Sequence, residues 1–232
     1  GVRVLYIRFE GGKGRRCMCE AQRLVWMGDL HLGALELTIS PEKWSGSVAI
    51  RSAIDGRVVN AGAKLYRKFN NKHLEPLAGE VIGEYDVYLL IRTCQSNIQV
   101  AQVARTRAFL DGQLVDVQRR TIEEPGYIGQ ELTVDIKQGE TLVVEKLISF
   151  YTSRDQAISE CGLEARKAIV RAGRFDAVKA DHLLACTPLW PRFDVLIQPA
   201  DPGFPLTVPL LLRCNMFHLQ QTVSLPSIGL AL

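Results

Sequence analysis

The spacing of apolar residues changes once along the chain, between Leu142 and Asp176. In the first part of this segment apolar side chains recur on one side, as in a strand with one buried face; they are Leu142, Val144, Ile148 and Phe150. Residues 165–172 instead carry apolar side chains at i, i+3, i+4 and i+7, which is helical spacing. The polar residues 151–155 supply a helix start, and Gly173 stands where a left-handed C-cap would follow. We therefore predict strands before this switch and helices after it.

Short alternating segments separated by turn residues fill the chain up to residue 150. The predicted strands are residues 2–9, 15–27, 35–40, 47–54, 87–91, 95–107, 132–136 and 142–150. Residues 95–107 also fit a helical turn, but strands flank them and Asp111-Gly112 closes them as a turn. Residues 60–84 are polar and contain glycine, so we expect the longest loop there. Many short strands without helices between them predict an antiparallel sandwich.

Three helices are expected after the switch, at about residues 160–172, from Arg174 to Pro188 or Pro191, and at 207–223. The second carries Phe175, Val178, His182, Cys186 and Leu189 on one face. A short strand at 193–197 and a proline-rich link at 199–205 precede the third. That third helix is apolar nearly all round and needs neighbours on several sides. Because residues for such neighbours do not follow it, and because Gly1 opens in mid-strand, the sequence reads as a fragment.

The composition excludes several classes of protein. A net charge of +3, from 28 basic and 25 acidic residues in 232, is too small to indicate a nucleic-acid partner. The basic spots Arg105-Thr106-Arg107 and Arg119-Arg120 lack interleaved aromatic residues, and no apolar run is long enough to cross a membrane. Six cysteines occur singly except for Cys17-Met18-Cys19, which predicts reduced thiols in a cytoplasmic protein.

Residue spacing presents no catalytic, cofactor-binding or metal-binding constellation. The glycine-rich segment 11–14 lacks the Gly-Lys-Ser/Thr order of a phosphate loop and is predicted to be a hairpin turn. The histidines, His31, His73, His182 and His218, have no metal-ligand spacing, and His218 is expected to be a hydrogen-bonded core residue. Glu123-Glu124 reads as a solvated turn, because adjacent side chains on an extended chain diverge.

Several sequence strings together are similar to one family. They are 55–62 (DGRVVNAG), 73–76 (HLEP), 92–96 (RTCQS), 104–107 (ARTR), 144–146 (VEK), 151–155 (YTSRD), 172–176 (AGRFD), 189–190 (LW) and 215–219 (NMFHL). In this order they resemble the N-terminal domain of glycoside hydrolase family 65, over nearly the whole chain. The sequence departs from the family pattern at Thr187-Pro188, Pro191, Gln220 and Leu225.

The resemblance implies a fold with three parts. These are an antiparallel β-supersandwich at residues 1–150, a helical linker at 151–192, and the first helix of an incomplete (α/α)₆ barrel at 193–232. The family's general acid is a glutamate in a Trp-Asp-Glu type motif on that barrel, and its phosphate-binding loop lies further along. Neither motif is present in this sequence.

The implied function is that of the N-terminal portion of a family 65 phosphorylase or hydrolase acting on α-linked disaccharides, inactive by itself. Inorganic phosphate is the implied co-substrate and no cofactor is expected. A disaccharide would bind through the barrel, and a homodimer through the β-sandwich is an open alternative. A second interpretation is a non-catalytic sandwich for packing, dimerisation or carbohydrate binding. A third is a galactose-mutarotase-like activity, for which no His/Glu pair is placed.

Overall fold

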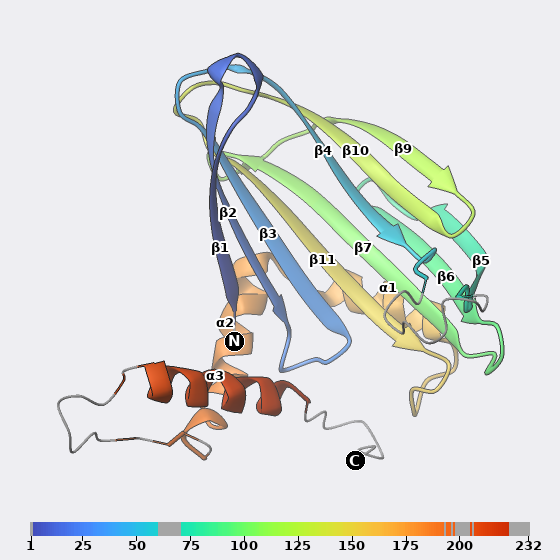
Figure 1. Cartoon of the computed structure of the whole chain (residues 1–232). Coiled ribbons are helices and arrows are strands. Elements are labelled where there is room, and N and C mark those ends of the chain that lie inside the picture. Colours follow the sequence, from blue (N-terminus) through green and yellow to red (C-terminus); the bar gives the residue numbers. More distant parts are fainter. Residues whose placement is uncertain are drawn as a thin grey trace.

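The chain forms two stacked antiparallel sheets, with two helices on the outer face of the larger one (Figure 1). A computed structural model describes residues 2–59, 71–192, 194, 195, 197, 205 and 207–222. Every strand pairing within both sheets is antiparallel, which confirms the predicted mainly-β class with C-terminal helices.

The large sheet runs in the order β1-β2-β3-β11-β7-β6-β5, with the short β8 beside β7. Its strands are β1 (Arg3–Glu10), β2 (Arg16–Val25), β3 (Leu32–Pro41), β5 (Leu74–Val81), β6 (Asp86–Thr93), β7 (Gln99–Leu110), β8 (Gln113–Leu114) and β11 (Leu142–Thr152). The small sheet runs in the order β4-β10-β9 and contains β4 (Gly46–Asp55), β9 (Gln118–Glu124) and β10 (Tyr127–Ile136). The α-helices are α1 (Cys161–Arg171), α2 (Phe175–Cys186) and α3 (Thr207–Thr222). Single 3₁₀ turns occupy Gly12–Gly14 and Trp190–Arg192.

Strand β11 is covered on both faces, which corrects the prediction of a single buried face. Leu142 and Val144 point between the two sheets and pack with residues of β10. Leu147 points the other way and packs under the helices. Phe150, expected on the buried side, is 47% exposed near the end of the strand. The sequence pattern does not reveal that the odd-numbered side of β11 is buried, because Glu145 and Ser149 on that side are polar. They are covered by the later helical segment, where Arg174 and Ala165 bind them.

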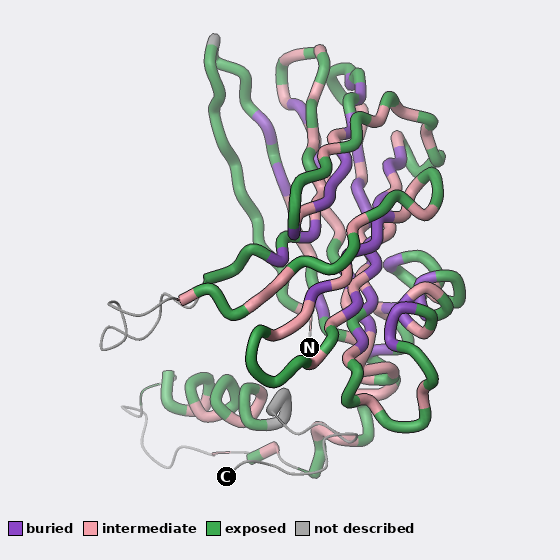
Figure 2. Tube along the Cα trace, turned by 90° about the vertical axis from the view of Figure 1, so that its right-hand side faces the viewer, coloured by how far each residue is buried: buried purple, intermediate pink, exposed green. Residues whose placement is uncertain are grey.

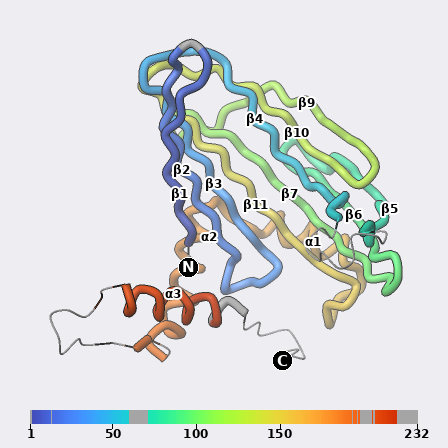
Figure 3. The backbone as a smooth tube through the Cα atoms, in the orientation of Figure 1, coloured from blue at the N-terminus to red at the C-terminus, as the bar shows by residue number. Residues whose placement is uncertain are grey.

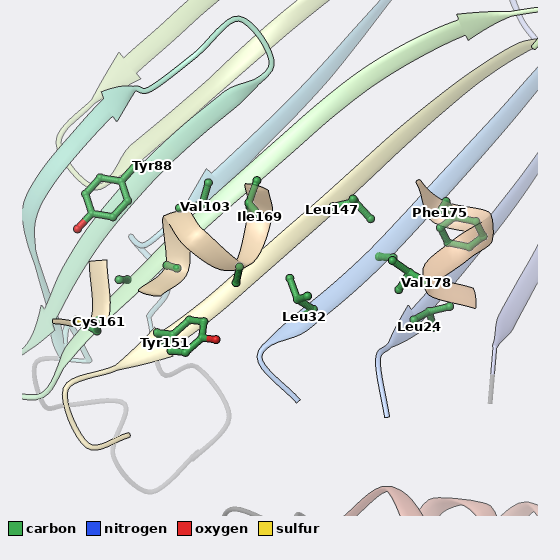
Figure 4. Close-up of a cluster of buried hydrophobic side chains, with 14 residues drawn as sticks. Leu24, Leu32, Tyr88, Val103, Leu147, Tyr151, Cys161, Ile169, Phe175 and Val178 are labelled. Carbon is green, nitrogen blue, oxygen red and sulfur yellow. The ribbon is translucent and has the colours of Figure 1, made fainter. Parts of the chain in front are cut away.

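Helices α1 and α2 close a hydrophobic core over the outer face of the large sheet (Figure 4). The helical spacing predicted for residues 165–172 is confirmed, since Ala165, Ala168 and Ile169 are buried against Val103 and Leu147. Helix α2 begins and ends close to the predicted bounds. It contributes Phe175 and Val178 to the same core, which also contains Leu24 and Leu32.

Strands β5, β8 and β9 were not predicted. Strand β5 lies within residues 60–84, where a loop was expected, and its pairing with β6 shifts register between Pro76 and Ala78. Proline and glycine at an edge strand hide its alternation. Strand β9 ends with Glu123 and Glu124, which are exposed just before the turn at Pro125. Residues 1, 60–70, 193, 196, 198–204, 206 and 223–232 lie outside the described residues, and so does most of the link expected at 199–205. Of the strand expected at 193–197, residues 194, 195 and 197 are described and lie in no strand.

The small sheet covers only part of the large one (Figure 3). Its strands contact β5, β6 and β7, while β1 is exposed along all eight residues (Figure 2). Leu35 of β3, predicted to be on a half-buried side, is 36% exposed for the same reason. Helix α3 lies beyond the end of the sheet, and its residues Leu210 and Leu211 are exposed. The predicted helix is confirmed, and within the described residues its apolar sides remain largely uncovered.

Candidate functional site at the junction of sheet and helices

Arg105 of β7 binds the C-terminal end of α1. The guanidinium of Arg105 donates to both carboxylate oxygens of Asp86 at 2.8 and 2.7 Å, and its third nitrogen donates to the carbonyl of Ile169 at 3.0 Å. The hydrogen bonds with Asp86 raise the pKa of Arg105. A cation at a helix C-terminus also interacts favourably with the negative end of the helix dipole. Arg105 thus fixes the last turn of α1 to the sheet.

Glu145 is the centre of a second cluster at the start of α2. Its side chain has no exposed surface, and its Oε1 accepts a hydrogen bond from Arg174 Nε at 3.0 Å. Arg107 Nη2 lies 3.3 Å from the other carboxylate oxygen and also donates to the carbonyl of Gly173 at 3.2 Å. The guanidinium of Arg174 sits 3.9 Å from the ring centroid of Phe109. A buried carboxylate is stable only when paired and hydrogen-bonded, and two arginines meet that condition here.

The strand register brings these charges together. Glu145 of β11 lies directly opposite Arg107 of β7, and residues opposite each other across antiparallel strands share a face. Arg105, two residues from Arg107, therefore also faces the helices. The sequence showed these arginines only as an isolated basic spot. One sequence pattern could have predicted this buried ion pair. It is an acidic residue in an otherwise apolar strand, together with basic residues at alternate positions of another strand.

The arginines also replace a predicted helix cap. Gly173 was expected to end α1 in the left-handed conformation, but it is absent from the residues with positive φ. The chain leaves α1 through Ala172, at φ −65° and ψ 130°, an extended conformation. Two carbonyls near this end, those of Ile169 and Gly173, are instead bound by Arg105 and Arg107. The direction of α2 is therefore set by the sheet rather than by a glycine turn.

Other contacts extend the junction across the sheet. Ser149 Oγ donates to the carbonyl of Ala165 at 2.8 Å, and Lys179 Nζ donates to Gln22 Oε1 at 2.7 Å. Burial raises the pKa of Glu36, and the charges of Asp176 and Glu145 add to this effect. Polar contacts thus fix both helices above a sheet face that is otherwise apolar.

Three of the described histidines lie in different surroundings. His31 Nε2 lies 3.8 Å from Asp155 Oδ2, and its ring packs edge-on against Tyr151 at 4.0 Å. His182 is buried on α2, where Nδ1 accepts a hydrogen bond from the Met27 amide at 3.1 Å. His218 is exposed on α3. Within the described residues it therefore does not occupy the core position that the sequence predicts. Among those residues no group of three or more His, Cys, Asp or Glu could hold a metal ion.

The described helices include none that is long and apolar enough to cross a membrane.

Comparisons with known proteins agree with the architecture. The family described as "Glycosyl hydrolase family 65, N-terminal domain" matches residues 1–187. An uncharacterized glycosyl hydrolase of Mycobacterium tuberculosis is 32% identical over 94% of this chain and 16% of its own length. The kojibiose phosphorylase of Thermoanaerobacter brockii is 26% identical, over 97% of this chain and 29% of its own length. The α,α-trehalose phosphorylase of the same organism is 24% identical, over 94% and 28%.

A solved structure supports the same fold. It belongs to a protein provisionally named as a kojibiose phosphorylase from the human microbiome, with a TM-score of 0.73 and 12% identity. The match covers 96% of this chain and 27% of the solved one. The chain thus spans less than a third of each of these relatives. With two stacked sheets, helices fixed to one of them and a family match over residues 1–187, the chain belongs to glycosyl hydrolase family 65, as its N-terminal domain.

Proposed function

We propose that this chain is the non-catalytic N-terminal part of a glycoside phosphorylase or hydrolase that acts on α-linked disaccharides. In this proposal residues 1–150 are the sandwich, 151–192 the linker and 193–232 the start of an (α/α)₆ catalytic barrel. Inorganic phosphate is the co-substrate of the whole enzyme, and the enzyme works in the cytoplasm. The kojibiose and trehalose phosphorylases among the relatives support this substrate class.

The main support for a positioning role is the buried carboxylate of Glu145. It is held by one arginine from the sheet and one from the start of α2, so the sheet and the linker share a single ion-pair cluster. Arg105 adds an independent bond to the end of α1. A domain that fixes two successive helices in this way can set the direction in which the following chain leaves. We infer that its contribution to catalysis is to place the barrel, not to touch the substrate.

The chemistry itself requires groups of another kind. Inverting phosphorolysis needs an acid that protonates the glycosidic oxygen while phosphate attacks from the opposite face. General acid catalysis contributes roughly 10²–10⁴-fold, and positioning of phosphate contributes more. The sequence presents neither an acid in a motif of that kind nor a recognisable phosphate-binding loop. The 232-residue chain is therefore expected to give only background rates.

The first test is an assay of glucose 1-phosphate release from maltose, kojibiose, nigerose and trehalose at saturating phosphate. We expect no turnover by the purified chain with any of the four sugars. A parallel assay of free glucose covers hydrolysis. Turnover that scales with the amount of chain would place an active site within residues 1–232 and overturn the proposal.

A chimera tests the positioning role directly. This chain would replace the matching N-terminal segment of the Thermoanaerobacter brockii kojibiose phosphorylase. We expect phosphorolysis of kojibiose by the chimera and a loss of that activity with Glu145→Ala. The matched control is Glu131→Ala, which removes a carboxylate paired with Arg51 and Arg120 on the outer face of the small sheet. Equal activity of the two variants would argue against the junction as the positioning element.

The alternative, a separate carbohydrate-binding or dimerising sandwich, gives different results. Calorimetric titration of the chain with the same disaccharides would then show saturable binding without turnover. Failure of the chimera together with such binding would favour the alternative.

A further inference from the structure

One part of the sandwich has an inner face without a second layer. The small sheet leaves uncovered the sandwich-side residues of β1 and the adjoining ends of β2 and β3, which we call the open face (Figures 1 and 3). The open face comprises Arg3, Leu5, Ile7 and Phe9 of β1, Arg23 and Val25 of β2, and Leu35 of β3. The fractional exposure of its apolar members is 47% for Leu5, 44% for Ile7, 49% for Phe9, 67% for Val25 and 36% for Leu35.

The register shows that these residues continue the buried core. Ile7 lies opposite Cys19, and Phe9 lies opposite Cys17, so each pair shares a face. Cys17 and Cys19 are buried in the core cluster with Leu132 of the small sheet. The same face of the large sheet is therefore buried core at Cys17 and Cys19 of β2 and open to solvent at the neighbouring residues of β1. Contiguous exposed apolar surface of this kind marks an interaction site.

The free edges on both sides of the open face are available for pairing. β1 pairs only with β2, and β4 pairs only with β10, within the described residues. Charged side chains normally discourage pairing at an edge, and of those on β1 Arg8 and Glu10 are already neutralised within the described part of the chain, while Arg3 is not. Arg8 makes a two-point ion pair with Glu42, and Glu10 pairs with Arg16.

Two arginines at one end of the open face indicate that a partner covering this face would carry a negative charge there. Arg3 lies directly opposite Arg23, and like charges directly opposite each other destabilise an antiparallel pair. Neither arginine makes an ion pair with a residue in the described part of the chain. A partner that covers the apolar residues and carries an acidic side chain at this end would relieve the repulsion. A second copy of the chain could instead stack its open face on this one, related by a two-fold axis parallel to the strands. That arrangement would bring the two arginines of each copy, four in all, close together.

We propose that the open face binds a further β-strand, supplied by another polypeptide segment, that extends the second layer of the sandwich beside β4. The strand has apolar side chains at every second position and an acidic residue facing Arg3 and Arg23. The apolar side chains cover Leu5, Ile7 and Phe9, and the acidic residue sets the orientation. This surface lies apart from the junction at Glu145, so it stands independently of the proposed function.

The test uses two labelled synthetic peptides with 232-residue protein. Both alternate valine and threonine over seven residues; the acidic probe ends in two glutamates and the basic probe in two lysines. Fluorescence anisotropy should show tighter binding of the acidic probe, by about tenfold, because only its charge complements the arginines. The double variant Arg3→Glu and Arg23→Glu should reverse this preference. Ile7→Lys, and separately Leu5→Lys, should abolish binding of both probes.

A matched control keeps the outcome clear. Val170→Lys changes an apolar residue that is 72% exposed on α1, away from the open face, and should leave binding unchanged. All altered positions are exposed, and the melting temperature of each variant shows that it is folded. The absence of binding, equal binding of the two probes, or binding that survives Ile7→Lys would overturn the proposal. So would sedimentation data in which Ile7→Lys converts a dimer to a monomer, because a second copy would then cover the open face.

Discussion

Arg174, at the start of α2, donates a hydrogen bond from Nε to Glu145 Oε1 at 3.0 Å, although Glu145 has no exposed surface. The two residues are 29 positions apart and lie on opposite sides of the boundary between sheet and helices. Arg107 approaches the same carboxylate from the sheet. One buried acid therefore links two parts of the chain that the sequence presents as separate.

Replacing this acid should be costly. We expect Glu145→Ala to lower the free energy of unfolding by about 1.5–3 kcal/mol, because it removes the charged acceptor of hydrogen bonds from Arg107 and Arg174, whose side chains are 19% and 47% exposed. Urea denaturation measures the difference. The control Glu131→Ala, at an exposed pair, should cost within about 1 kcal/mol. Similar losses for the two variants would show that the cluster does not stabilise the fold.

Lys146 should give the stability a distinct alkaline pH dependence. It points between the sheets, donates to the carbonyl of Ala53 at 2.6 Å, and burial lowers its pKa from 10.5. Between the lowered folded value and 10.5, the unfolded chain holds a proton that the folded chain has released. The contribution of Lys146 to stability therefore rises with pH across that interval.

Denaturation curves of the wild type and of Lys146→Met between pH 7 and 10.5 isolate this contribution. The difference in unfolding free energy, wild type minus variant, should increase with pH. Val170→Met, at an exposed residue without an ionisable group, should give a difference that stays constant. A constant difference for Lys146→Met as well would contradict the burial argument.

The six cysteines should be free thiols with two classes of reactivity. Titration of the denatured protein without reductant should find six thiols. In the native protein Cys94 and Cys214, which are exposed, should react first. Burial raises the pKa of Cys17 and Cys161, and that of Cys19 to about 11, so these three should react slowly because the thiolate is the reactive form. Bound zinc, or a deficit of two thiols, would count against reduced cysteines.

Removing the last helix should improve solution behaviour. Leu210, Leu211 and Leu219 of α3 are each at least 61% exposed, so the helix presents an apolar surface that favours self-association. We expect the chain truncated after Arg192 to be more monodisperse by light scattering, with an unchanged near-ultraviolet spectrum. Equal aggregation of the truncated and full-length chains would show that α3 does not cause the self-association.

The sequence by itself determined most of the element types. Alternating side chains identified β1, β2, β3, β4, β6, β10 and β11, and helical spacing identified all three helices, because both periods follow from local backbone geometry. The family resemblance is confirmed over residues 1–187. Strand β5 was missed because Pro76 and the neighbouring shift in register interrupt its alternation.

Only the tertiary structure decided which faces are buried and how the helices are held. Leu35 and Phe150 are apolar but exposed, while Glu145 is acidic and buried, because burial depends on what the other sheet or the helices cover. The end of α1 is fixed by Arg105 and Arg107 instead of by Gly173. These arginines are more than sixty residues away, and a partner at that separation is set by strand register, which no local pattern records.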